Sequence, residues 1–304
     1  MSDRVVDQWV EPISQEQPCG DDLSYDPAYL QLESLASGEP DQQMGESVHE
    51  GRDPDWGQLL NTAEKLMQRT RDLRVATFWC LAQLNINGIP GFRDGIELIQ
   101  RLVEEHWPDV HPKLDPDDGN DPLERVNILQ SLSPTASVYR DPMMFVQRLR
   151  EATLAQAQQM GKASLRDIML ARGELESADD SQVPDNALVQ AIFADTPVEN
   201  LQQQQQALDD INDRLQSMIE FLDRTLGNAS APDFTRLADE VKHMRAILGE
   251  FLNTRGYAQE NEQAEAEDGS QAVSNQAPRG GSISGEVTNR ADVMVALDRI
   301  CSYY

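Results

Sequence analysis

A three–four spacing of apolar residues over two long runs most constrains the fold of this 304-residue chain. From residue 201 to 222 the apolar side chains recur at steps of 7, 3, 4, 3 and 4, and a second run from 234 to 251 keeps the same rhythm. This spacing places apolar side chains on one narrow stripe of an α-helix. The short turn-forming segment 227–232 makes the two helices antiparallel neighbours, so the sequence predicts a helical hairpin over residues 201–252.

The predicted hairpin has a narrow apolar seam that draws on both helices. Its members are Leu208, Ile211, Leu215, Met218, Leu222, Leu237, Val241, Met244 and Leu248. A single hairpin buries little apolar surface by itself. We therefore expect this seam to pack against a second hairpin or against the domain that precedes it.

Helical spacing also runs through most of the first ~195 residues. Asp-Pro pairs at 26–27 and 53–54 match a helix N-cap followed by proline. The remaining expected elements are a central buried helix at 72–86, a turn at 87–91, a helix ending at Pro108, helices at 122–132, 141–150, 164–172 and 185–195, and a loop at 39–53. No segment alternates apolar and polar residues as a half-buried strand does, so the predicted fold class is all-α.

Composition divides the chain into four predicted parts. They are an N-terminal multi-helix domain at 1–182, a helical middle region with the hairpin at 183–256, a flexible linker at 257–285 and a short helix at 286–304. The linker is acidic and then rich in Gly, Ser and Asn, so it has too few large apolar residues to order itself. The last segment regains helical spacing but is too short to form a domain, so we expect it to begin an incomplete C-terminal helical domain.

The charge balance excludes two classes of partner. With 25 Lys and Arg against 53 Asp and Glu, the formal net charge is −28. Nucleic acids and anionic membranes are bound by clustered Lys and Arg, and so large a deficit of positive charge argues against both. No apolar run approaches the ~20 residues of a membrane span, and the start does not resemble a signal peptide. Three widely separated cysteines, Cys19, Cys80 and Cys301, suit a reducing cytoplasm and not a disulfide scaffold.

The usual catalytic and metal-binding patterns do not occur in the sequence. No phosphate-binding glycine loop and no nucleophile motif is present. His106 and His111 lack further ligands at metal spacing, so we interpret them as exposed or helix-capping residues. The acidic run 115–121 fails the EF-hand pattern at positions 5, 6 and 12 and is interpreted as a turn before a helix that starts at Asp121-Pro122. We predict no catalytic residue, metal or cofactor, and an enzyme that uses paired carboxylates stays a less favoured alternative.

Three arginines lie close together in this acidic chain: Arg69, Arg71 and Arg74. One interpretation is a helix junction held by Arg–Asp pairs, in which Arg71 or Arg74 reaches the loop that contains Asp21 and Asp22. The other interpretation is a docking patch for a partner protein. The planar guanidinium suits pairing with carboxylates, which favours the structural interpretation.

Several short motifs follow one another in a fixed order over residues 8–175. They are Pro18–Pro27, Asp55-Trp56, Arg69–Val75, Trp107–Asp115, Asn120–Pro122, Arg125–Asn127 and Ser164–Asp167. Together they resemble the ImpA-type N-terminal domain of the TssA family, whose members are components of bacterial type VI secretion. The motif residues that we single out as structural or docking candidates are Cys19, Gly20, Asp21, Asp22, Trp56, Arg69, Arg71, Asp72, Arg74, Trp107, Pro112, Arg125, Asn127, Arg166 and Asp167.

The resemblance implies a non-enzymatic, cytoplasmic assembly protein that is recruited to the secretion apparatus at the inner membrane. Its implied partners are baseplate, membrane-complex, tube and sheath proteins, and it would help to start or coordinate tube and sheath assembly. Family members form rings through a C-terminal domain, and residues 289–304 are similar to the beginning of that domain. A homo-oligomer is therefore expected where that domain is complete. The charge alone leaves a second hypothesis, an acidic adaptor that binds a basic effector or chaperone in a salt-sensitive way.

Overall fold

The computed structural model describes residues 3–38, 42–44, 47–49, 51–135, 141, 143–177 and 183–257. These residues belong to one compact unit that extends to Gln259. The division predicted between residues 182 and 183 is therefore not a break in packing. The predicted linker from residue 258 onward and the predicted C-terminal helix lie outside the described residues.

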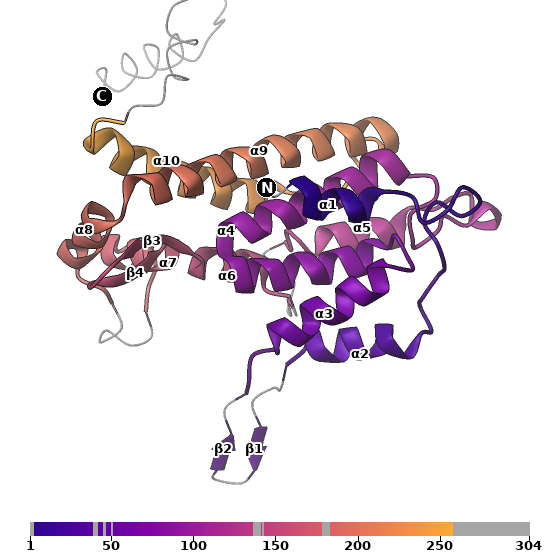
Figure 1. The fold of residues 1–304 in the computed structure, drawn as a ribbon, viewed down its shortest axis with the longest axis horizontal. Coiled ribbons are helices and arrows are strands. Elements are labelled where there is room, and N and C mark those ends of the chain that lie inside the picture. Colours follow the sequence, from indigo (N-terminus) through magenta and orange to yellow (C-terminus); the bar gives the residue numbers. More distant parts are fainter. Residues whose placement is uncertain are drawn as a thin grey trace, which may run out of the picture. The chain divides into compact units, whose positions relative to one another are not determined.

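The described part of the chain is mainly helical (Figure 1). Its helices are α1 (Asp3–Val10), α2 (Pro27–Ala36), α3 (Trp56–Met67), α4 (Leu73–His106), α5 (Leu123–Gln130), α6 (Phe145–Glu151), α7 (Leu165–Arg172), α8 (Asn186–Asp195), α9 (Val198–Leu226) and α10 (Thr235–Thr254), with a 3-10 turn η1 (Pro116–Asp118). Its strands are β1 (Gln42–Met44), β2 (Ser47–His49), β3 (Thr153–Ala157) and β4 (Gly161–Ser164). Over this part of the chain, no helix combines the length and the apolar character that a membrane span requires.

The long element α4 consists of two helical halves that fold back on each other. Gly88, with φ +63° and ψ −143°, breaks the helical backbone inside the predicted turn at 87–91. The halves then approach closely, because a Cβ added to Gly91 would lie 2.3 Å from the carbonyl oxygen of Gln83. Every residue from Val75 to Leu84 is buried, which confirms that the first half is the central helix.

Local start signals place the N-termini of several helices. Asp26 caps α2, since its Oδ1 accepts a hydrogen bond from Ala28 N at 2.8 Å. The second predicted start shifts by two residues: Asp55, and not Asp53, caps α3. Asp53 instead lies 3.1 Å from Arg148 Nη2 in an ion pair. Asp121 accepts a hydrogen bond from the first residue of α5, which confirms the turn-and-start interpretation of the acidic run.

The predicted hairpin is present as α9 and α10, which lie side by side (Figure 1). All nine seam residues named above are buried. The seam packs against α4, so within the described residues its partner is the preceding helical region and not a second hairpin. Ion pairs line the same contact, with Arg214 Nη2 of α9 2.7 Å from Glu97 Oε2 of α4.

The all-α prediction is wrong in one respect, because two small antiparallel pairs of strands are present. β1 pairs with β2 inside the predicted loop at 39–53, and β3 pairs with β4. These strands are only three to five residues long, too short for an alternating pattern to stand out. β3 and β4 also contain several Ala, Gly and Lys residues, which have weak strand preference. Contacts of β3 with α8 help to hold this pair in place.

Candidate functional site

Three motifs that lie far apart in the sequence meet at one place in the fold. We call this cluster the motif junction and define it as residues 19–24, 69–74 and 107–112 together with Arg125 of α5. Backbone hydrogen bonds join its segments: Arg71 N donates to Cys19 O at 2.8 Å, and His111 N donates to Arg71 O at 3.0 Å. The segment that carries the predicted arginine cluster therefore lies between the other two.

Gly20 allows the first two segments to touch. Its φ of +68° is a conformation that other residues rarely adopt, and a Cβ at this position would lie 2.1 Å from the carbonyl oxygen of Arg69. The neighbouring Cys19 is buried, and burial raises the pKa of its thiol to about 11. Both motif residues therefore have structural roles in closing the junction.

Arg71 is buried at the centre of the junction and ties helix ends together. Its guanidinium donates to Glu11 O at 2.7 Å, to Gln8 O at 3.2 Å, to Thr70 O at 3.1 Å and to Met67 O. The carbonyls of the last turns of α1 and α3 carry partial negative charge, which suits a buried cation. Burial lowers the pKa of Arg71. With its donors used in this way, Arg71 has a structural role.

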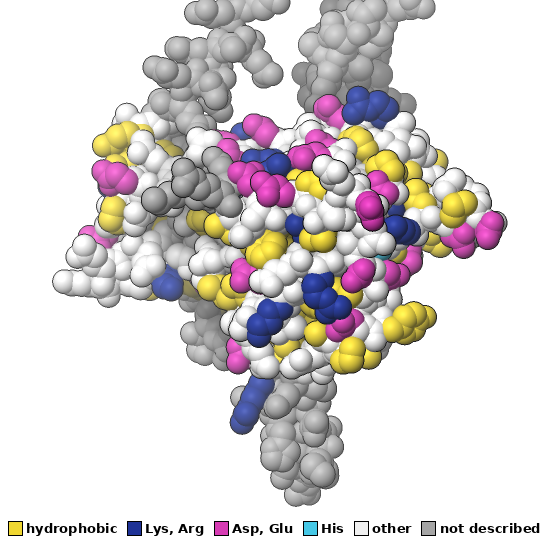
Figure 2. All heavy atoms as spheres, turned by 45° about the vertical axis from the view of Figure 1, so that its right-hand side comes forward, with side chains coloured by type: hydrophobic (Ala, Val, Ile, Leu, Met, Phe, Trp, Pro, Cys, Tyr) yellow, Lys and Arg dark blue, Asp and Glu magenta, His cyan; other side chains and the backbone are white. Residues whose placement is uncertain are grey.

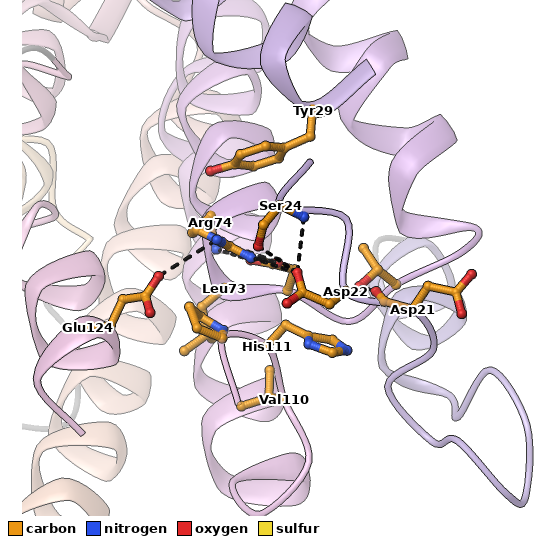
Figure 3. Close-up of polar contacts among 12 residues, drawn as sticks. Asp21, Asp22, Ser24, Tyr29, Leu73, Arg74, Val110, His111 and Glu124 are labelled. Atoms are coloured by element: carbon orange, nitrogen blue, oxygen red, sulfur yellow. Dashed lines mark hydrogen bonds and ion pairs between the residues drawn. The ribbon is translucent and has the colours of Figure 1, made fainter. Parts of the chain in front are cut away.

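Arg74 reaches the acidic loop, as the structural interpretation predicts (Figure 3). Its Nη2 lies 2.6 Å from Asp72 Oδ2 and 3.5 Å from Asp22 Oδ1, and its Nη1 lies 3.6 Å from Glu124 Oε1. The guanidinium also lies 5.1 Å from the centre of the Tyr29 ring. Burial alone would lower the pKa of Arg74, but the hydrogen bonds and charge of Asp72 raise it above its ordinary value. Arg74, in α4, therefore contacts the loop of Asp22 and helix α5 through carboxylates and helix α2 through the Tyr29 ring.

Arg69, the third member of the predicted cluster, is the most exposed of the three. Half of its side chain is exposed, and its Nη1 pairs with Asp26 Oδ2 at 2.8 Å. An exposed pair of this kind contributes little to stability. All three arginines thus have acceptors within the fold.

Arg125 holds the segment 107–112 from the inside. It donates from Nε to Pro112 O at 2.6 Å, from Nη2 to Val110 O at 2.6 Å and from Nη1 to Trp107 O. Its guanidinium also lies 4.8 Å from the centre of the Trp107 ring. Burial lowers the pKa of Arg125 to about 10. Trp107, Pro112 and Arg125, which the sequence singled out separately, therefore act together to shape one loop.

The two candidate histidines are buried hydrogen-bonding residues. His106 Nε2 lies 2.7 Å from Val10 O, the last residue of α1, so the helix-capping interpretation is correct for His106. His111 Nε2 lies 3.1 Å from Gly20 O inside the junction. The interpretation of either as exposed is wrong. Among the residues that the structure describes, no group of three or more His, Cys, Asp or Glu could hold a metal ion.

The remaining motif residues are outside the junction. Trp56, at the start of α3, has the Arg148 guanidinium 4.5 Å from the centre of its ring. Asp167 completes a capping box at the start of α7. Asn127 is exposed on α5 and Arg166 is half-buried on α7. The motifs therefore mark helix starts and packing sites as well as the junction itself.

The outer surface of the junction presents carboxylates and an exposed aromatic residue. Asp21 and Asp22 are exposed. Partial burial would raise the pKa of Asp22, but hydrogen bonds from Ser24 and the charge of Arg74 hold it below its ordinary value, so this carboxylate stays ionised. Tyr25 is 96% exposed, and sequence reasoning did not single it out. The sequence did contain a sign that Tyr25 is exposed, because this residue lies inside the first motif but outside the apolar stripe of α2.

Two leucines that adjoin junction contacts are also exposed. Leu30, next to Tyr29 on α2, is 55% exposed, and Leu123, next to Glu124 on α5, is 58% exposed. Acidic, basic and hydrophobic side chains are interspersed over the surface that Figure 2 brings forward from the right-hand side of Figure 1. Aromatic and apolar side chains among carboxylates can bind a partner protein that carries basic groups.

Comparison with known proteins identifies the family. The family model for "ImpA, N-terminal, type VI secretion system" matches residues 10–134. Over 300 residues the chain is 32% identical to the type VI secretion system component TssA1 of Pseudomonas aeruginosa, an alignment that covers 96% of this chain and 83% of that protein.

The fold is also similar to a solved structure. That structure is the N-terminal domain, including the conserved ImpA_N region, of the TssA component of the type VI secretion system from Burkholderia cenocepacia. The TM-score is 0.65 at 23% identity, over 83% of this chain and 95% of that domain. The extent and the level of identity to TssA1 show that this chain belongs to the TssA family of type VI secretion system components.

Proposed function

We propose that this protein is a non-enzymatic scaffold of the type VI secretion apparatus, and that the outer surface of the motif junction is one of its docking surfaces. Its partners are baseplate, membrane-complex, tube or sheath subunits, and its role is to start or coordinate tube and sheath assembly. It works in the cytoplasm and is recruited to the apparatus at the inner membrane. Membership of a family of apparatus components supports this proposal.

The observation that carries the proposal is which charged groups of the junction are bonded within the fold and which are exposed. Arg71 and Arg125 donate to backbone carbonyls, and Arg74 pairs with Asp72, so these cations serve the fold. The exposed groups on the outside include Asp21, Asp22 and the ring of Tyr25, and the half-exposed Arg69 pairs with Asp26. An exposed aromatic ring flanked by carboxylates is typical of a protein-contact surface and matches no catalytic arrangement.

Deletion of the gene with complementation tests the role in the apparatus. The deletion strain should lose secretion and sheath assembly, and the wild-type gene should restore both. Normal sheath dynamics in a deletion strain without a second copy of the gene would contradict the proposal.

Tyr25→Ala tests the docking surface. Since Tyr25 is almost fully exposed, this variant should keep the melting temperature while weakening binding to the cognate apparatus subunit at least tenfold. Tyr257→Ala is the matched control, because Tyr257 is 46% exposed, lies after the end of α10 and is outside the junction. Equal binding by Tyr25→Ala and the wild type would remove the junction from the proposed interface.

The net charge of −28 favours a second candidate, an adaptor for a basic effector or chaperone. This candidate predicts a binding affinity that falls steeply as the salt concentration rises from about 0.05 to about 0.5 M, because salt screens the attraction between exposed charges. Binding through Tyr25 would depend less on salt, because ring burial is not screened.

Self-association is a further part of the proposed scaffold role. We expect a homo-oligomer where the C-terminal domain that residues 286–304 begin is complete. Light scattering on this chain and on a chain extended at its C-terminus measures the contribution of that domain. Equal monomeric masses would contradict this expectation.

A further inference from the structure

A cavity of about 520 Å³ lies where the break in α4, strand β3 and the first turns of α9 meet. It is bordered by residues 84–88 of α4, by residues 151–154 before and within β3, and by Asn200, Gln203 and Gln204 of α9. A volume of this size is typical of pockets that bind ligands. None of these residues belongs to the motif junction, and the resemblance to the family singled out none of them.

The cavity is lined by amide side chains with unused hydrogen-bonding capacity. Among the residues that the structure describes, the side chains of Gln156, Asn200, Gln203 and Gln204 have no hydrogen-bond partner. Gln204 Oε1 is buried as well as unpartnered. A buried polar atom without a partner is costly to the folded state, so a ligand that donates a hydrogen bond to it would be stabilised. Carboxamides offer both donors and acceptors, as a peptide main chain does.

The charge of the lining contrasts with the charge of the chain. Arg148 and Lys162 line the cavity against one carboxylate, Glu151, although the whole chain carries −28. Arg148 donates to Asn85 and pairs with Asp53, but its Nε is buried without a partner. Lys162, on β4, makes no ion pair with another described residue. A carboxylate that entered the cavity would therefore meet two cations.

Strand β3 supplies a backbone edge beside this lining. β3 and β4 form a two-stranded sheet, so β3 has no strand partner on its other side within the described part of the chain. Three residues of β3, namely Thr153, Leu154 and Gln156, border the cavity. An unpaired strand edge can accept an extended peptide as an added strand.

We propose that this cavity is a binding site for an extended peptide segment of a partner protein that carries at least one Asp or Glu. The main chain of the peptide bonds to β3 and to the carboxamides of α9, and its carboxylate binds Lys162 and Arg148. This site differs from the docking surface at the motif junction in chemistry, since its cationic lining selects an acidic segment.

Selection from a phage-displayed library of random nonapeptides on the full chain tests the proposal. Enriched peptides should contain Asp or Glu, and the corresponding synthetic peptides should shift amide NMR signals of residues 84–88, 151–156 and 200–204. Lys162→Glu should weaken their binding at least tenfold and leave the melting temperature unchanged, because Lys162 is exposed. Lys242→Glu on α10 is the matched control, since Lys242 is exposed and does not line the cavity.

Three results would overturn the proposal. One is enrichment of peptides without acidic residues, and another is equal affinity of the Lys162→Glu variant and the wild type. The third is competition by inorganic phosphate at the same concentration as the peptide, which would make the cavity a site for small anions. These outcomes are independent of Tyr25→Ala, so failure here leaves the proposed docking surface standing.

Discussion

Gly95 lies directly against Cys80 across the two halves of α4. A Cβ added to Gly95 would lie 2.3 Å from Cys80 Sγ and 2.8 Å from Cys80 Cα. Two residues fifteen positions apart can come so close only because the chain reverses at Gly88 between them. The hairpin within α4 therefore depends on the absence of a side chain at Gly95, and α3 and α9 pack on the helices that it brings together.

Gly95→Ala should destabilise the protein by about 1–3 kcal/mol, the usual cost of an overpacked core. Urea denaturation followed by circular dichroism measures this loss. Gly249→Ala is the control, because a Cβ on this helical residue of α10 meets nothing within 4 Å. Replacing a helical glycine by alanine stabilises by up to about 1 kcal/mol. If Gly95→Ala stabilised the protein as Gly249→Ala should, the two halves of α4 would not touch at Gly95.

Arg125→Met should destabilise the protein by at least about 3 kcal/mol, since it leaves three buried carbonyls without their donor. Those carbonyls belong to Trp107, Val110 and Pro112. Arg69→Met is the comparison, because half of the Arg69 side chain is exposed and loss of its ion pair with Asp26 should change stability far less. Comparable losses in the two variants, measured by urea denaturation, would contradict the role given to Arg125.

Leu215→Asp and Val241→Asp should each disrupt the α9–α10 hairpin. Both side chains are buried in the seam, and a carboxylate placed there would have no partner. The expected result is a loss of helical circular dichroism or a large fall in melting temperature. Gln216→Asp, one residue along on the exposed side of α9, should change neither by much. Unchanged stability of the seam variants would show that the seam is not part of the core.

Alkaline pH should destabilise the protein partly through Cys19. Burial raises the pKa of its thiol from an ordinary 9.0 to about 11, so between these values the folded protein holds a proton that the unfolded chain releases. The stability contributed by the neutral thiol is therefore complete below pH 9 and is lost as pH rises toward 11. Denaturation at pH 8.5 and 10.5 should show a smaller decrease for Cys19→Ala than for the wild type.

Thiol labelling checks the same residues without substitution. Cys19 and Cys80 are both buried, and burial raises the pKa of both thiols. At pH 8 each should react with a thiol reagent at least tenfold more slowly in the native protein than in guanidinium. Mass spectrometry after timed quenching identifies which cysteine is modified. Rapid native labelling of Cys19 would contradict its place inside the motif junction.

Features that depend on neighbours along the chain could be predicted from the sequence alone. The seam of α9 and α10 follows from helical periodicity, and the cap at Asp26 and the turn at Asp121 before α5 follow from local turn chemistry. The one broad error is that the two strand pairs were not predicted, because no pattern of neighbouring residues marks them. β3 and β4 are too short and too rich in small residues for a local pattern, and packing against α8 decides their conformation.

The hydrogen-bond partners in the candidate site could not be predicted from the sequence. The sequence by itself determined that Arg69, Arg71 and Arg74 form a cluster of cations in an acidic chain, and it placed Arg125 in one of the motifs that resemble the family. Only the tertiary structure decided what they bind: Arg71 donates to a carbonyl 63 residues away, and Arg125 donates to carbonyls 13 to 18 residues away. Every residue carries a backbone carbonyl, so no pattern of side chains can mark which carbonyls a buried guanidinium will meet.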